Sequence, residues 1–135
     1  MPMTFEWNSP TASRLSREEQ TAFDDNSIPM WIFDIRTLVF LAVNDAAVTD
    51  YGYTRKQFLA MSILDIRPSE EIVPMIRKEL KKGRHNSDRE TWRHRKSDGS
   101  VIGVRISSHP IAFHNRYAEM ETVEQCHSSE VDTKF

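Results

Sequence analysis

Few side chains in this sequence have the type and spacing needed for covalent or acid–base chemistry. Cys126 is the single cysteine, so the chain cannot close an internal disulfide or build a zinc site that needs two thiolates. Ser107, Ser108 and His109 are consecutive, and neighbouring side chains of a strand point to opposite faces, which separates Ser108 from the His109 base. The sequence therefore does not favour nucleophilic catalysis.

The five histidines show no metal-ligand spacing. His85 follows a run of lysines and arginines, which is typical of a solvated surface, and His94 lies in a predicted strand where it faces either the interior or the solvent. Asp65, Glu70 and Glu71 form an acidic cluster. Because carboxylates are stabilised at the start of a helix by its dipole, we interpret these three as helix-start residues rather than as a catalytic pair.

Composition bounds the class of protein. A chain of 135 residues, 39% hydrophobic and 28% charged, suits one folded domain and is too short for a catalytic domain plus a regulatory one. Its longest apolar stretch is well short of the roughly 20 residues of a membrane helix, and residues 1–13 are polar where a signal peptide has an apolar segment. We therefore expect a cytoplasmic protein with no membrane partner.

Positive charge is concentrated in one part of the chain. Between Arg77 and Arg105 there are ten lysines and arginines against four acids, although the net charge of the whole chain is −2. Trp92 is the single aromatic residue interleaved with these charges, whereas a nucleic-acid site needs several stacking residues. We expect a solvated face and no nucleic-acid partner.

A short amphipathic helix is predicted within residues 13–23. Ser16 and Glu19 have the spacing of a capping box, and Leu15 and Phe23 flank the segment as apolar anchors. So few apolar residues cannot stabilise a helix alone, and the helix must lie on the domain or on a partner. Leu15 and Phe23 are therefore our candidate interface residues. We expect an N-terminal extension over 1–24, a domain over 25–125 and a tail over 126–135.

The remaining elements form an α+β pattern. Two runs of β-branched and aromatic residues, 30–34 and 38–43, predict a hairpin. Three short helical segments follow with their own signals, which are Asn44 as cap and Gly52 as terminator, Thr54 with Gln57, and Ser62 with Asp65. A longer helix is predicted from Pro68 to Gly83.

Three strands should end the domain, near residues 89–96, 100–110 and 117–125. Turn signals at Asp98-Gly99 and His114-Asn115 separate them. Two strands, several helices and three strands predict a five-stranded antiparallel sheet with short helices packed on one face, plus the N-terminal helix. Such a fold encloses a small interior, which we call the cup.

Over residues 25–125 the sequence resembles a PAS domain of the bacterial sensory-box type. The resemblance is carried by "IPMWIFD", "FLAVNDAAVTDYGYTRKQFLAMSILDIRPSEE", "WRHRKSDGS" and "ISSHPIAFHNR". It implies a sensor or protein-interaction module of bacterial signal transduction, of the kind attached to histidine kinases and to GGDEF and EAL proteins. This chain would then be no enzyme itself, but a regulatory part of a two-component sensor histidine kinase or a diguanylate cyclase.

The resemblance also directs attention to cofactors. Blue-light flavin members need a cysteine in the helical segment, where this sequence has "AMSILDIRP", and Cys126 lies beyond the last strand. We therefore expect neither a covalent flavin adduct nor a thioester-linked chromophore. Haem members take an axial histidine from the long helix, and His85 falls past its expected end, so haem is not expected either. The cofactor stays unknown.

A non-covalent ligand in the cup is left open. Such a site and an ordinary filled core need the same mostly apolar residues. Trp31, Tyr51 and Trp92 combine an apolar body with a hydrogen-bonding tip and are best suited to orient a ligand. The full candidate lining is Trp31, Phe33, Val43, Tyr51, Phe58, Met61, Ile66, Met75, Ile76, Leu80, Trp92, Val104, Ile106, Ser108 and Met120.

Three functions follow from these observations, in descending order. The first is a non-enzymatic sensor that self-associates as a homodimer through its N-terminal helix and exposed sheet face, and that regulates a kinase or a cyclic-di-GMP effector. The second is a receptor that binds an apolar or aromatic small molecule non-covalently in the cup. The third, a small enzyme such as an isomerase, would need a strongly perturbed acid or base inside the cup and ranks last.

Overall fold

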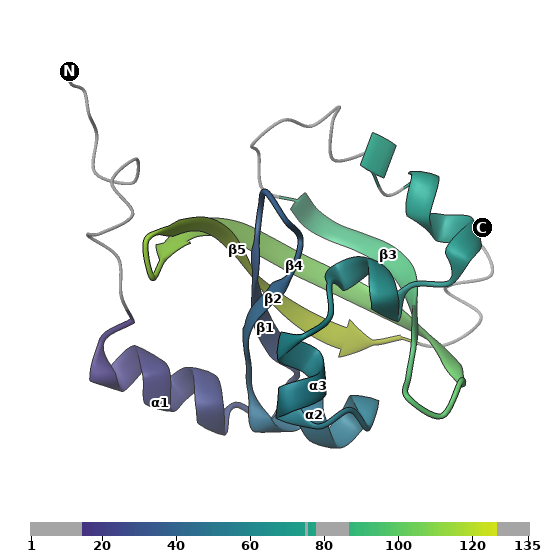
Figure 1. Ribbon diagram of the computed structural model, residues 1–135. Coiled ribbons are helices and arrows are strands. Elements are labelled where there is room, and N and C mark those ends of the chain that lie inside the picture. Colours follow the sequence, from purple (N-terminus) through teal and green to yellow (C-terminus); the bar gives the residue numbers. More distant parts are fainter. Residues whose placement is uncertain (1–14, 75, 78–86, 127–135) are drawn as a thin grey trace.

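The computed structural model describes residues 15–74, 76–77 and 87–126, with the backbone alone for residues 87–90 (Figure 1). Its elements are α1 (Arg17–Asp25), β1 (Met30–Asp34), β2 (Phe40–Val43), α2 (Asp45–Tyr51), α3 (Arg55–Leu59), the 3-10 helices η3 (Ile63–Ile66) and η4 (Ser69–Glu71), β3 (Ser87–Arg95), β4 (Val101–Phe113) and β5 (Arg116–Gln125). The strands form one antiparallel sheet in the order β2-β1-β5-β4-β3. The predicted α+β class is confirmed. No helix in the described part of the chain is long and apolar enough to cross a membrane.

The sheet has two faces with separate cores. Its inner face curls around α2, α3 and η3 and carries the larger cluster of buried side chains, centred on Trp31. Its outer face is covered in part by α1, whose Phe23 packs with Ile32, Phe113 and Ala118. The predicted helix with its Ser16–Glu19 capping box is confirmed. The helix therefore lies on the domain, held by one buried aromatic side chain.

The turns follow their sequence signals. His114 and Asn115 have left-handed φ values of 49° and 65°, as a two-residue hairpin turn requires. Strand β2 begins later than predicted, at Phe40 rather than residue 38, because Leu38 also has a left-handed φ of 68°. The Asp34 carboxylate shapes this turn by accepting hydrogen bonds from the backbone N–H groups of Arg36 and Thr37.

Asn44 joins three elements. The Asn44 side chain is fully buried, and its Oδ1 accepts hydrogen bonds from Ala47 N, which caps α2, and from Met30 N at the start of β1. Its Nδ2 donates to the carbonyl oxygens of Phe23 and Ile28, which belong to α1 and the segment that follows it. One amide therefore fixes where α1 ends relative to the sheet and the first inner helix.

The segment after η3 departs from the long predicted helix. Pro68 precedes the short helix η4, and residues 72–74 and 76–77 are helical, while the rest of the predicted span up to Gly83 lies outside the described residues. Ile76, expected to line the cup, is 40% exposed instead. Its helix turns this side chain outward, so the helical spacing of its apolar residues did not identify the inner face.

Candidate functional site

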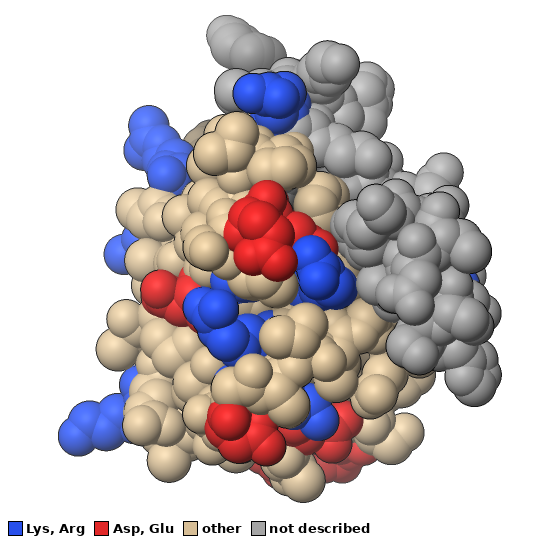
Figure 2. All heavy atoms as spheres, turned by 90° about the vertical axis from the view of Figure 1, so that its right-hand side faces the viewer, with Lys and Arg blue, Asp and Glu red and all other residues tan. Residues whose placement is uncertain are grey.

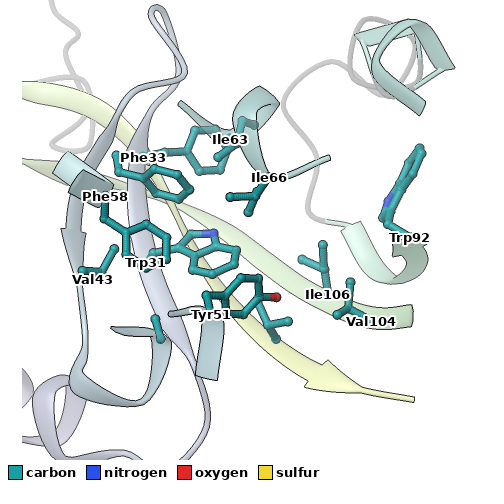
Figure 3. Packing of buried hydrophobic residues seen from close by; sticks show 13 residues of the cluster. Trp31, Phe33, Val43, Tyr51, Phe58, Ile63, Ile66, Trp92, Val104 and Ile106 are labelled. Atoms are coloured by element: carbon teal, nitrogen blue, oxygen red, sulfur yellow. The ribbon is translucent and has the colours of Figure 1, made fainter. Parts of the chain in front are cut away.

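One half of the cup is filled by aromatic rings. Trp31 lies at its centre, with ring centroids 5.3 Å from Phe40, 5.4 Å from Tyr51 and 6.2 Å from Phe58 (Figure 3). All four residues are at most 1% exposed, and four of the contacts among them are edge-to-face. Such contacts are typical of a close-packed core. This half of the cup therefore serves to fix the fold.

The other half carries polar side chains on the inner face. Glu119 and Glu121 of β5 and Ser108 of β4 are buried there. Trp31 Nε1 donates a hydrogen bond of 2.8 Å to Glu121 Oε1, which joins the aromatic half to the polar one. Neither glutamate was predicted from the sequence, because strand alternation alone does not tell whether they or Ala118 and Met120 face inward.

Tyr51 and His94 form the second polar contact of the cup. The Tyr51 hydroxyl lies 2.6 Å from His94 Nδ1, and His94 is 1% exposed. Burial, with the nearby positive charge of Arg67, holds the pKa of His94 well below its usual range, and burial raises the pKa of Tyr51 above its ordinary value. The imidazole is therefore neutral, and it shares one buried hydrogen bond with the Tyr51 hydroxyl. His94 faces the interior, which settles the alternative left open by its sequence.

A group of charges joins η4 to β3. The Glu71 carboxylate accepts hydrogen bonds from the backbone N–H of Arg93 at 3.0 Å and from Arg93 Nε at 2.8 Å, while Glu70 Oε2 lies 3.1 Å from Arg93 Nη2. Arg67 is buried, with Nη1 4.0 Å from Glu71 Oε1 and its guanidinium 4.6 Å above the Trp92 ring. Glu71 lies in the first turn of η4, as expected of a helix-start carboxylate, and its side chain is also buried against β3.

Most of the predicted lining lies on the inner face. The buried inner cluster contains Trp31, Phe33, Val43, Tyr51, Phe58, Ile66, Trp92, Val104 and Ile106, with Met61 packed against it, and Trp92 lies at the end of the cup away from Phe58 (Figure 3). Met120 is a correction: it pairs with Ile32 rather than Trp31, so it faces outward and packs in the outer cluster. Met75 and Leu80 lie outside the described residues.

The predicted interface residues differ from each other. Phe23 is buried within its own chain, 3% exposed, and anchors α1 on the sheet. Leu15 is half-buried and lines a groove of about 310 Å³ beside α1 on the outer face. The apolar side chains of this groove are Leu15, Ala22, Phe23, Met30, Ile111 and Met120, and its polar ones are Glu19, Asn26 and His109.

Charges elsewhere are mixed in sign. On the side of the molecule shown in Figure 2, acidic and basic side chains lie close together among uncharged ones. Arg55 lies 2.7 Å from Asp45, and Arg116 lies 2.7 Å from Asp34. Within the described residues, no group of three histidines, cysteines or acids is placed to hold a metal ion.

The chain was compared with known proteins. A family model of the PAS domain matches residues 28–123. The chain belongs to the PAS domain family. PAS domains are sensory modules of signal transduction that regulate rather than catalyse, and the expected resemblance is confirmed. No curated protein matches the sequence of this chain.

Solved PAS structures share the fold at low identity. The PAS domain of a protein from Colwellia psychrerythraea has a TM-score of 0.72 at 14% identity, covering 83% of this chain and 97% of that one. A PAS domain from a two-component sensor histidine kinase has a TM-score of 0.68 at 21% identity, covering 81% and 96%. A PAS domain in complex with ethanol, from a LuxR-family transcriptional regulator of Burkholderia thailandensis, has a TM-score of 0.64 at 16% identity, covering 78% and 95%.

Proposed function

We propose that this PAS domain is a non-enzymatic sensor that self-associates through α1 and the outer face of its sheet and regulates a kinase or a cyclic-di-GMP effector. The observation that carries the proposal is the apolar groove beside α1. Its floor of Met30, Ile111 and Met120 is half-buried, although each belongs to a central strand of the sheet. Apolar side chains left partly open in this way favour an interface.

Sedimentation or light scattering of the whole chain tests self-association. We expect a dimer at micromolar concentration, and a monomer after Met120→Glu, because a carboxylate on the groove floor would have to be desolvated in the interface. Val101→Glu is the matched control, since Val101 is 47% exposed and lies outside the groove. A monomeric wild-type chain, or a folded Met120→Glu variant that stays dimeric, would contradict the proposal.

A receptor function is the second candidate, favoured by the polar contacts inside the cup. Inside the cup, Glu121 is bonded to Trp31 and His94 is bonded to Tyr51, and the lining around these pairs is mostly apolar. A few polar groups within an apolar lining are typical of a ligand site. We propose that a ligand would lie at the Trp92 end, since rings fill the end near Phe58.

Native mass spectrometry of freshly purified protein tests the receptor function. We expect an added mass that disappears on denaturation, and its loss in a folded Trp92→Ala variant, with Val101→Ala as control. A wild-type chain that carries no added mass contradicts the receptor function while leaving the sensor proposal intact.

A further inference from the structure

The groove on the outer face lies between β1, which α1 covers, and β4, which is exposed there. Ile32 of β1, Met120 of β5 and His109 of β4 are paired side by side across the sheet. Phe23 of α1 packs in the cluster with Ile32, whereas His109 is exposed. Since strands are about 4.8 Å apart, His109 lies roughly 10 Å from the strand that α1 covers. The groove therefore has α1 as one wall and an open edge at β4.

These two edges carry groups of opposite charge. Glu19 on α1 and His109 on β4 both line the groove, and both are exposed. The Glu19 carboxylate is held in place by the capping box, in which its Oε1 accepts a hydrogen bond of 2.8 Å from Ser16 N. A protonated His109 would give the groove a negative edge and a positive edge with apolar side chains between them.

Among the described side chains, the immediate neighbours of His109 on β4 and β5 are uncharged. Met120 lies opposite it on β5, and Ser107 and Ile111 are its neighbours on the same face of β4. Strand β3 pairs with β4 only as far as Ser108, so no described residue of β3 pairs with His109. Other charged side chains described on the outer face include Asp34 of β1, which pairs with Ala118 and is bonded to Arg116, and Arg105 and Glu124, which pair across β4 and β5 four residues away from His109 along β4. Glu19 is the charged group that α1 contributes to the groove.

We propose that two copies of this chain pack groove to groove about a two-fold axis that runs along the groove, so that Glu19 of each copy lies opposite the partner's His109, and that the dimer tightens at acidic pH. A two-fold rotation about this axis brings each edge of the groove against the opposite edge of the second copy. An axis across the groove would instead place Glu19 opposite the partner's Glu19 and His109 opposite the partner's His109, so that like charges would be in contact. Complementary charge thus selects one of the two arrangements.

The inference rests on the proposed self-association and adds its geometry and its pH dependence. Histidine gains its charge as pH falls through the range from 8 to 5, whereas glutamate stays ionised. Each dimer contains the contact twice, because a two-fold interface repeats every pair. Exposed ion pairs are individually weak, so we expect a dissociation constant roughly threefold to tenfold lower at pH 5.5 than at pH 8.

Sedimentation equilibrium of the full chain at pH 5.5 and pH 8 tests the arrangement with single and double variants. Glu19→Gln keeps an acceptor for Ser16 N, so α1 stays capped, and it should weaken the dimer and remove the pH dependence. His109→Gln should do the same, and the double variant should be no weaker than either single one, because both remove one contact. His109→Lys should stay tight at both pH values. Glu18→Gln and His114→Gln, exposed residues outside this groove, are the controls.

The outcomes separate this inference from the proposed function. A wild-type dimer whose dissociation constant is unaffected by Glu19→Gln and His109→Gln, or whose variants act additively, overturns the edge-to-edge arrangement and leaves self-association standing. A wild-type chain that is monomeric at both pH values overturns both, and the groove then takes another partner. A pH dependence that persists in His109→Gln and disappears in His114→Gln also overturns the inference.

Discussion

The Tyr51 hydroxyl and Nδ1 of His94 share a hydrogen bond of 2.6 Å in the interior of the domain, where each residue is about 1% exposed. Tyr51 ends α2 and His94 lies near the end of β3, so this bond joins an inner helix to the edge strand of the sheet. Burial and the nearby positive charge of Arg67 keep the imidazole neutral by lowering its pKa.

This relationship predicts how stability depends on pH. The pKa of His94 is held well below its usual range in the folded state, so below about pH 6.5 the unfolded chain binds a proton that the folded chain does not. The free energy of unfolding should therefore fall as pH decreases below 6.5, by about 1.4 kcal/mol per pH unit from this residue. Urea unfolding between pH 5 and 8 measures it.

Two variants assign that slope to His94. The double variant Tyr51→Phe/His94→Phe removes both polar partners and should lose the pH slope that His94 contributes. Near pH 7 its loss in free energy of unfolding should be smaller than that of Tyr51→Phe alone. Tyr51→Phe alone leaves the buried Nδ1 of His94 without its hydrogen-bond partner and should cost about 1–3 kcal/mol. An unchanged slope in the double variant, compared with the exposed-site control His114→Gln, would contradict the assignment.

Removing the Asn44 side chain should be more damaging than removing an exposed cap. Asn44→Ala deletes hydrogen bonds to α1, β1 and α2 inside the protein and should lower the free energy of unfolding by about 2–4 kcal/mol. Ser16→Ala breaks only the exposed capping box of α1 and should cost about 1 kcal/mol. Urea unfolding of both variants measures the difference, and equal costs would show that the buried amide contributes nothing beyond capping.

The tie between η4 and β3 should depend on Arg93. Arg93→Ala leaves the Glu71 carboxylate, whose side chain is 5% exposed, without its main donor and should cost about 2–4 kcal/mol. Arg55→Ala is the matched control, because the pair of Arg55 with Asp45 is largely exposed, and it should cost at most about 0.5 kcal/mol. Hydrogen exchange at the Glu71 amide, which donates to Pro68 O, should accelerate in Arg93→Ala and stay unchanged in Arg55→Ala.

Two glycines at left-handed positions should respond differently to alanine. Gly52 has a φ of 84° and Gly99 a φ of 89°, so each substitution should cost about 1 kcal/mol in backbone strain. A Cβ at Gly52 would also meet the Ser97 side chain, whereas nothing lies within 4 Å of a Cβ at Gly99. Gly52→Ala should therefore have the lower melting temperature of the two variants. Equal melting temperatures would show that Ser97 moves aside without cost.

Local signals predicted the elements well, because each acts over a few residues. The capping boxes at Ser16, Thr54 and Ser62 start helices as expected, and Gly52 ends α2 with the left-handed φ that its type allows. The turn at His114-Asn115 is likewise fixed by short-range backbone preferences.

The candidate site was less predictable because it depends on register between distant strands. Strand alternation grouped Met120 with Ala118, but the pairing of Ile32 with Met120, 88 positions apart in the sequence, decides that this group faces outward and that Glu121 faces Trp31. The burial of Glu71 depends in the same way on its contact with Arg93 of β3. Contacts between residues so far apart in the chain produce no periodic pattern in the sequence.

Asn44 connects a helix on one face of the sheet to a helix on the other. The Asn44 side chain forms hydrogen bonds with the residues that end α1 on the outer face. It also forms one with the first turn of α2 on the inner face. A shift of α2 of about 1 Å relative to α1 would stretch at least one of these hydrogen bonds beyond its usual range of 2.7–3.2 Å. The inner helix and the outer helix are thus mechanically linked at one end of the sheet through a single residue, with no need for the strands between them to bend.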